Sequence, residues 1–506
     1  MSEPIPRSSE PRTSSALAGV AWLLAFRIVD RLAGVISFLV LARLLLPEHF
    51  GVVALATAVI AFIEIITSLG LDTILIQIRQ LTRAHYDTAW TIQIAMAVFC
   101  AALIAAAAYP MSEFFREPRL FPVLCVLALS LAIEGLQNIK MVDFRREMRF
   151  DKEFVFLACR RLITICVTIG VAVVFRNEWA LAIGMLVSRI VGTALSYMMR
   201  PYRPTLTLSL RREFLTKSSW LLLSSIVMFM RQRSSDFALG RMRDAASVGA
   251  YTVASDLATM VTMELTVPIN RVALSDLSAQ RTREDLVSRF NTVTGLVAVV
   301  LTPLGLGLAA CAQVAVLVLF GPAWVIAGDV LQVLAIASLI SAMVSNLGVP
   351  IISLGHYRYN AIIHAVGAAA LLPLLVVGVF YHGPVGAAIA VLIANFITAA
   401  TAMVLAGRAM DYGLGRFLLC VWRPVLSGVA MYSVVLVTGQ LAASGSAPLA
   451  PALQLILMVL VGAITYPLAL IAIWAACRFP DGAERLSLAI FMKLLNKVRQ
   501  RHTSSG

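Results

Sequence analysis

Long apolar runs separated by short polar segments make up almost the whole chain from residue 16 to residue 476. About 20 apolar residues in a helix cross the hydrocarbon core of a membrane, because each residue adds 1.5 Å of length. Each run reaches that length, and the pattern therefore predicts fourteen membrane-spanning helices. Their expected ranges are 16–42, 48–78, 84–109, 119–139, 153–175, 178–199, 215–240, 246–276, 288–319, 324–352, 358–381, 384–407, 417–440 and 451–476.

The composition supports this class. Of the 506 residues, 60% are hydrophobic and 13% are charged, which is far outside the range of soluble proteins. The expected fold class is therefore an all-α integral membrane protein. The seven cysteines form no CxxC pair, and the chain has no HExxH motif and no phosphate-binding loop of the GxxxxGKS or GxxxxGKT type. We expect no metal site, no cofactor and no ATPase activity.

The basic residues divide unequally between the two sides of the membrane. If the fourteen helices alternate in direction, both termini lie on one side, together with 26 lysines and arginines, and 6 lie on the other side. Short cytoplasmic connections are rich in Lys and Arg, so the basic side is expected to be cytoplasmic. The net charge of +14 is then mostly a topology signal, and we expect no nucleic-acid partner.

The chain also repeats itself at an offset of 198 residues. Segment 42–54 aligns with segment 240–252 and superimposes Arg43 on Arg241. Six helices separate the copies, so both copies have the same orientation. We expect two six-helix lobes related by a pseudo-two-fold axis along the membrane normal, plus two extra C-terminal helices. The expected domains are a disordered cytoplasmic N-terminus (1–15), an N-lobe (16–214), a C-lobe (215–408), the extra helices (409–476) and a basic amphipathic cytoplasmic tail (477–506).

The expected seventh helix contains charges in the middle of the stretch WLLLSSIVMFMRQRSSDFALG, residues 220–240. One charge near the bilayer centre costs on the order of 2.5–3.5 kcal/mol, so such groups face a bundle interior or a watery cavity. Arg233 and Asp236 are three residues apart and can pair, which leaves a structural role open for them. Arg231 lies on another face of the helix and is expected to face a cavity.

The first helix, which is the repeat equivalent of the seventh, carries two arginines four residues apart. We expect these and the arginines of the seventh helix to form the cationic floor of a substrate cavity. The expected substrate-binding residues are Arg27, Arg31, Arg231 and Arg233.

Carboxylates in the spans are a second group of candidates. Each of them either neutralises an arginine or takes up and releases a coupling ion, and the sequence leaves both roles open. The ion-coupling candidates are Glu64, Asp236, Asp256 and Glu264.

Three stretches resemble those of Wzx-type polysaccharide flippases, which are related to MATE drug exporters and the lipid II flippase. They are LARLLLPEHFGVVALATAV (41–59), FRREMRF (144–150) and VLFGPAWVIAGDVLQVLAIAS (318–338). The resemblance is greatest to colanic-acid and succinoglycan exporters and covers residues 16–410. It implies two six-helix lobes around a central cavity. It also implies transfer of an undecaprenyl-diphosphate-linked oligosaccharide to the periplasmic leaflet of a bacterial inner membrane, in exopolysaccharide or lipopolysaccharide biosynthesis. A polymerase and glycosyltransferases would be partners.

The residues support such a substrate independently of the resemblance. A lipid-linked sugar diphosphate has an anionic head, and Arg guanidinium groups bind phosphate oxygens in pairs and keep their charge. The alternative is a MATE-like exporter of drugs or cations, for which four arginines against two aspartates in the first and seventh helices fit poorly. An enzyme would need a large loop with catalytic residues. No internal connection is long enough for one, so we expect no catalytic residues and no enzyme activity.

Overall fold

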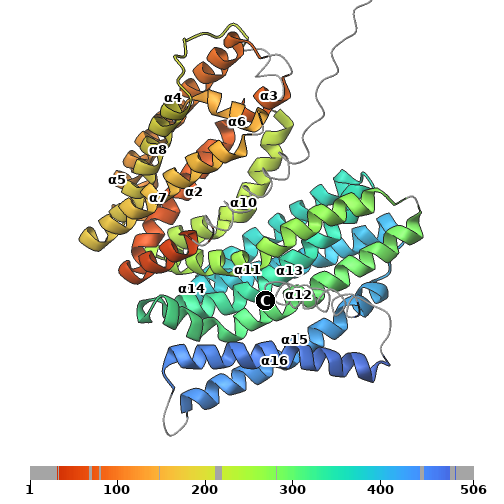
Figure 1. The fold of residues 1–506 in the computed structure, drawn as a ribbon. Helices are drawn as coiled ribbons and strands as arrows, with labels where there is room; N and C mark the ends of the chain where they lie inside the picture. Colours follow the sequence, from red (N-terminus) through yellow and green to blue (C-terminus); the bar gives the residue numbers. More distant parts are fainter. Residues whose placement is uncertain are drawn as a thin grey trace, which may run out of the picture. The chain divides into compact units, whose positions relative to one another are not determined.

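The computed structural model describes residues 31, 33–67, 71–78, 81–147, 149–210, 219–280, 282–444, 449–478 and 485. Within these residues every extended element of regular structure is a helix, and no strand occurs. The chain divides into two compact units, with the boundary between Ile226 and Val227 (Figure 1). The lobe boundary expected after residue 214 stays a prediction.

The first unit contains helix Ala33–Leu44 and seven further α-helices. The bounds are α2 (Pro47–Thr67), α3 (Leu71–Gln77), α4 (Arg83–Phe115), α5 (Leu120–Gly135), α6 (Val142–Arg146), α7 (Phe150–Phe175) and α8 (Trp179–Met199), with the 3-10 helix η1 (Ile139–Met141) before α6. Helix α5 packs against α2, α4 and α8, and α7 packs against α8. Helix α5 is therefore the centre of this unit.

The second unit contains the longest helices. The bounds are α11 (Ala245–Ser278), α12 (Arg283–Leu319), η2 (Pro322–Trp324), α13 (Val325–Ser353), α14 (Tyr357–Met410), α15 (Leu414–Ser444) and α16 (Pro451–Ala476); α10 (Ser219–Met242) crosses the boundary between the units. Helix α13 packs against α11, α12 and α14, and α15 and α16 pack against each other and against α12. Helix α13 takes the central place that α5 has in the first unit.

Helix α14 is a hairpin of two helical arms. Its backbone is non-helical at Gly383, which has φ = 57° and ψ = −134°. The arms approach so closely that a Cβ atom added to Gly378 would lie 2.4 Å from the carbonyl oxygen of Gly386. The side chain of Arg243 donates hydrogen bonds to the carbonyl oxygens of Val379 and Phe380 at the end of the first arm. The turn is thus held from the connection between α10 and α11.

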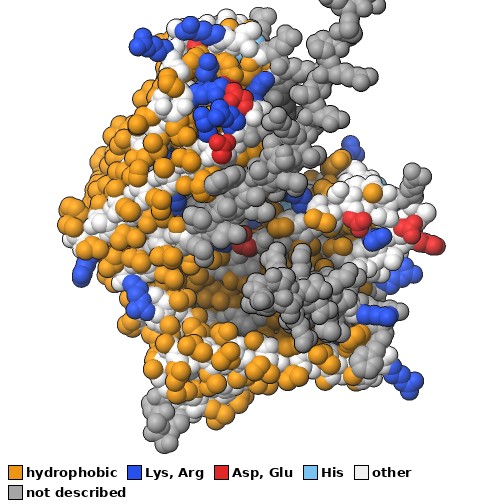
Figure 2. Space-filling view, in the orientation of Figure 1, with side chains coloured by type: hydrophobic (Ala, Val, Ile, Leu, Met, Phe, Trp, Pro, Cys, Tyr) orange, Lys and Arg blue, Asp and Glu red, His pale blue; other side chains and the backbone are white. Residues whose placement is uncertain are grey.

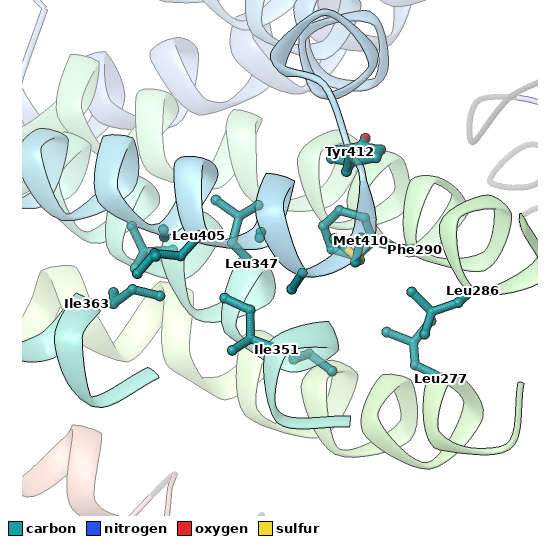
Figure 3. Packing of buried hydrophobic residues seen from close by; sticks show 14 of the residues in the cluster. Leu277, Leu286, Phe290, Leu347, Ile351, Ile363, Leu405, Met410 and Tyr412 are labelled. Atoms are coloured by element: carbon teal, nitrogen blue, oxygen red, sulfur yellow. The ribbon is translucent and has the colours of Figure 1, made fainter. Parts of the chain in front are cut away.

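Apolar packing holds the second unit together at one end of these helices. Leu277 of α11, Phe290 of α12, Ile351 of α13 and Met410 of α14 are each 2% or less exposed and belong to one buried cluster. Figure 3 shows these side chains meeting between the four helices. Burial of a side chain of this size away from water stabilises a fold by about 1.5–3 kcal/mol. Inside a membrane, where water is absent, close packing of the side chains stabilises the fold instead.

Nine of the described helices are long and apolar enough to cross a membrane, or ten if the bent pair of α5 with η1–α6 is one span. Figure 2 shows hydrophobic side chains covering α15 and α16, where Leu419 and Leu441 are exposed. The expected all-α membrane class is confirmed. The number of fourteen spans stays a prediction, since part of the first expected helix lies outside the described residues.

Helices α2 and α3 lie within the second expected helix, 48–78, and residues 68–70 between them lie outside the described residues. The structure differs from the expected helices after α5. The connection 140–152 contains η1 and α6, which bend away from α5 by 66°. The sequence there is polar and short, so its apolar pattern did not indicate a helix.

The repeat is visible in the helix bounds. Helix Ala33–Leu44 ends and α2 begins 198 residues before the end of α10 and the start of α11. The neighbour relations recur as well, because α2, α4 and α8 pack on α5 as α11, α12 and α14 pack on α13. Each unit is therefore built on the same packing plan.

Candidate functional site

Arg231 lies in α10 and contacts both arms of α14. Its Nη1 atom is 3.0 Å from Nδ1 of His364 in the first arm, and its Nη2 atom donates to Oδ1 of Asn395 in the second arm, at 3.2 Å. The guanidinium group is partly buried. Both of these acceptors are neutral, so they orient the guanidinium and leave its charge in place. Among the described residues Arg231 forms no ion pair.

Arg233, two residues further along α10, has a different environment. Its Nη1 atom is 3.1 Å from Oδ2 of Asp236, whose side chain is only 6% exposed. Arg233 also interacts electrostatically with Asp256 of α11. The two arginines of this helix are therefore unlike, because Arg233 faces carboxylates and Arg231 faces neutral groups.

A second cluster lies inside the first unit. Arg189 of α8 forms an ion pair with Glu134 of α5, and it interacts electrostatically with Glu64 of α2. All three side chains are partly buried. One arginine thus stands between carboxylates from two neighbouring helices, as Arg233 does in the second unit.

The remaining candidates are placed as follows. Arg27 lies outside the described residues, and Arg31 is partly buried in the first unit. Glu264 is exposed on α11, as is Asp256. The described candidates belong to different units, Arg31 to the first and Arg231 and Arg233 to the second, and the assignment of all four arginines to one cavity floor stays a prediction. The ion-coupling roles of the carboxylates stay predictions too.

His364 and Asn395 are candidates that the charge pattern of the sequence did not indicate. Both stand within long apolar runs, AIIHAVGAAA and VLIANFITAA, and a polar residue inside a span is by itself a signal worth following. The expected Arg231 cavity had no named partners because these two residues are 133 and 164 positions away.

The end of the first unit that carries α3 and α6 is rich in cations (Figure 2). Arg200, just after α8, contacts Asp143 at 3.0 Å and Glu147 at 2.7 Å. The Arg200 guanidinium beside Glu147 holds the pKa of that carboxyl below its ordinary value. Lys140 lies over the ring of Tyr202, 4.4 Å from its centroid. The connections predicted to share the basic side therefore do meet in space.

The segment after α8 is fastened to the start of α4. The backbone N–H and the hydroxyl of Thr205 donate to Asp87, the hydroxyl of Tyr202 donates to the same carboxylate, and the N–H of Thr207 donates to the hydroxyl of Thr91. Burial and the hydrogen bond to Asp87 raise the pKa of Tyr202. These bonds tie residues 201–208, which have no regular secondary structure, to the first turns of α4.

A cavity of about 330 Å³ opens between α4, α5, α6 and α7 of the first unit. Its lining includes Glu134, Asn138 and the ion pair of Arg145 with Glu153. The amide of Asn138 donates to the carbonyl oxygen of Arg200 and accepts from the N–H of Lys140. The polar groups of this cavity therefore hold the bend between α5 and α6 in place.

The chain is similar to proteins of polysaccharide biosynthesis and transport. The sequence profile of the family described as polysaccharide biosynthesis protein matches residues 40–329. The lipopolysaccharide biosynthesis protein WzxC of Escherichia coli is 21% identical over 81% of this chain and 84% of its own. The succinoglycan biosynthesis transport protein ExoT of Rhizobium meliloti is 26% identical over 59% of this chain and 61% of its own.

Two solved structures are similar in fold. The lipid II flippase MurJ in an inward closed conformation has a TM-score of 0.71 and 12% identity, and the match covers 90% of this chain and 99% of that one. A multidrug resistance MATE family transporter in an inward-facing conformation has a TM-score of 0.51 and 15% identity, with coverage of 78% and 98%. At these identities the likeness concerns the fold alone.

Proposed function

Because the chain belongs to the family of polysaccharide biosynthesis proteins, we propose that it flips an undecaprenyl-diphosphate-linked oligosaccharide from the cytoplasmic to the periplasmic leaflet of a bacterial inner membrane. The resemblance noted in the sequence is confirmed by the family and by the relatives. The chain is a multi-pass membrane transporter of polysaccharide biosynthesis and not an enzyme. The particular substrate, the membrane and the direction are parts of the proposal.

The environment of Arg231 is the observation that supports this proposal most. A guanidinium inside a membrane helix is costly, and among the described residues its acceptors are neutral. Such a group retains a positive charge and N–H donors in a planar array, which is the chemistry that a diphosphate head requires. A purely structural arginine in a span is expected to face a carboxylate, as Arg233 does.

Reconstitution tests the proposal directly. The purified full chain would be placed in liposomes containing a fluorescent undecaprenyl-diphosphate-linked oligosaccharide, and access of a membrane-impermeant quencher would report movement between leaflets. We expect the protein to accelerate movement at least tenfold over empty liposomes. A fluorescent phosphatidylglycerol serves as the control lipid and is expected to move no faster than without protein. Equal rates for the glycolipid with and without the chain would refute the proposal.

We also propose that transport is coupled to an ion and proceeds by alternating access. Each unit supports this with a cluster in which one arginine interacts with two carboxylates, namely Arg189 with Glu64 and Glu134, and Arg233 with Asp236 and Asp256. In each cluster the charges of one arginine and two carboxylates sum to −1, and a bound proton or sodium ion would compensate this charge.

Neutralised variants test the coupling. In liposomes with an imposed proton or sodium gradient, we expect Glu64→Gln or Asp256→Asn to reduce the acceleration by the gradient at least threefold, with expression unchanged. Asp236→Asn and Glu264→Gln complete the set. Glu284→Gln, in the exposed first turn of α12, is the control and should respond as the parent chain does. Full gradient response in all four variants would show that these carboxylates only neutralise arginine.

Export of a cationic compound is the second candidate function. The exposed carboxylates of Asp256 and Glu264 on α11 favour it, because they offer negative charge to such a compound. Ethidium distinguishes the two functions. Under the proposed function ethidium is not transported by the reconstituted chain, whereas gradient-driven ethidium export would favour the alternative.

A further inference from the structure

The contacts of Arg231 define a site that joins three helices. The guanidinium of α10 lies between His364 in the first arm of α14 and Asn395 in the second arm, and Asn395 in turn donates from Nδ2 to the carbonyl oxygen of Ala337 in α13, at 2.9 Å. The arms lie close together beside it, since a Cβ atom added to Gly367 would be 2.5 Å from Oγ1 of Thr398. The site is therefore fixed by backbone packing.

The contact with Arg231 also fixes the tautomer of His364. A guanidinium can only donate hydrogen bonds, so Nδ1 of His364 must present its lone pair to Arg231. The hydrogen of the neutral ring is then on Nε2, which is a donor. The His364 side chain is exposed, so this donor can reach a ligand. Arg231 and His364 together present N–H groups from two adjacent side chains.

Asn395 has a different part in the site. Its side chain is 6% exposed, and both ends of its amide are engaged, one with Arg231 and one with the backbone of α13. The bond to Ala337 orients the amide so that its oxygen faces the guanidinium. An aspartate there would hold the guanidinium as well and would also cancel its charge. An amide orients the cation without neutralising it, which is what an anion-binding site needs.

We propose that Arg231 and His364 form an anion-binding subsite in the second unit that takes a phosphate group of the lipid-linked substrate, with Asn395 as its positioning residue. The inference rests on the proposed function, from which the substrate class comes. The guanidinium binds two phosphate oxygens and Nε2 of His364 donates to a third or to a bridging oxygen. A phospholipid head group has related chemistry, and the experiment has to separate the two sources.

Binding to the full chain in lipid nanodiscs tests the subsite, with undecaprenyl diphosphate as the probe and thermal stability measured on the same samples. We expect Asn395→Asp to weaken binding at least tenfold with no loss of thermal stability, because the new carboxylate pairs with Arg231. His364→Phe should weaken binding about threefold to tenfold by removing one donor. Since His364 is exposed, this second variant decides the question even if Asn395→Asp does not fold.

The control variants carry the same kinds of substitution at positions that do not contact Arg231. His382→Phe alters an exposed histidine near the turn of α14, and Asn346→Asp introduces a carboxylate at a buried asparagine of α13 that donates to Thr294. Both should bind the probe as the parent chain does, measured on the folded fraction. A purely structural contact predicts instead that Asn395→Asp binds the probe normally.

The outcomes separate the inference from the proposed function. If the parent chain does not bind undecaprenyl diphosphate, the proposed function is wrong. If it binds the probe and both Asn395→Asp and His364→Phe bind equally well, the subsite is wrong and the proposed function stands. If excess phosphatidylglycerol displaces the probe from the parent chain and not from His364→Phe, the site holds a phospholipid head group and the assignment to the substrate is overturned.

Discussion

The two arginines of α10 show that the partner of a charged side chain determines what its substitution does. Arg233 pairs with a carboxylate three positions away on the same helix, and Arg231 reaches two neutral side chains of another helix. Both charges lie in α10, which the sequence predicts to be a span. Substitution of Arg233 should therefore mainly impair folding, whereas substitution of Arg231 should mainly impair transport.

We expect Arg233→Ala to lower the folded yield and to destabilise the chain by about 1–3 kcal/mol, since it leaves the buried Asp236 carboxylate without this partner. Adding Asp236→Asn should restore part of the loss. Thermal unfolding of the detergent-solubilised variants measures both effects.

Arg231→Ala is the matched comparison. It removes a charge from α10 and leaves only neutral groups behind, so we expect a smaller loss of stability than for Arg233→Ala and a loss of flipping of at least tenfold. A stability loss at Arg231 as large as at Arg233 would contradict the distinction between the two arginines.

At the scale of elements, the α14 hairpin depends on close backbone approach. A methyl group at Gly378 would meet the carbonyl oxygen of Gly386 at 2.4 Å, so Gly378→Ala must push the arms apart. Overpacking of this kind costs about 1–3 kcal/mol. Gly170→Ala in α7, where nothing lies within 4 Å, is the control and should be neutral or slightly stabilising. Equal melting temperatures for the two variants would show that the two arms of α14 can move apart without loss of stability.

The connection between α6 and α7 is fastened to the end of α8 through Glu147 and Arg200. The pKa of Glu147 is lowered in the folded chain, so the pair stabilises the fold at neutral pH and its contribution is lost as the pH falls through the acid range. The effect should be about 0.2–1 kcal/mol, because the pair is partly exposed. Thermal unfolding of Glu147→Gln should accordingly differ from the parent chain at pH 7 and converge with it as the pH falls below the ordinary glutamate pKa value of 4.5. A constant difference across this range would contradict the assignment.

Local pattern accounts for the elements that the sequence predicted. The spans were predictable because each is a long apolar run, and the Arg233–Asp236 pair was predictable because both residues lie on one helix face. The partners of Arg231 were not, since they come from a helix more than a hundred residues away. The bend at η1–α6 was missed because its stability comes from contacts such as those of Arg146 with the carbonyl oxygens of Leu75 and Ile78.

For the whole molecule, the unequal distribution of basic residues makes a topological prediction. With 26 lysines and arginines on one side and 6 on the other, both termini should be cytoplasmic. A reporter that is active only in the cytoplasm should be active after Gly506, and a reporter that is active only in the periplasm should be inactive there. The same pair placed after Arg243, in the connection that holds the α14 turn, should give the opposite result. Periplasmic activity after Gly506 would rule out an even number of spans.

The long separation of Arg231 from its partners has a consequence for biogenesis. A chain is synthesised from its N-terminus, so α10 leaves the ribosome before His364 and Asn395, 133 and 164 positions later, have been made. During that interval the guanidinium has neither acceptor, and the membrane insertion machinery receives a charged helix whose partners do not yet exist. We therefore expect the insertion of α10 to be completed only when the second arm of α14 has been made.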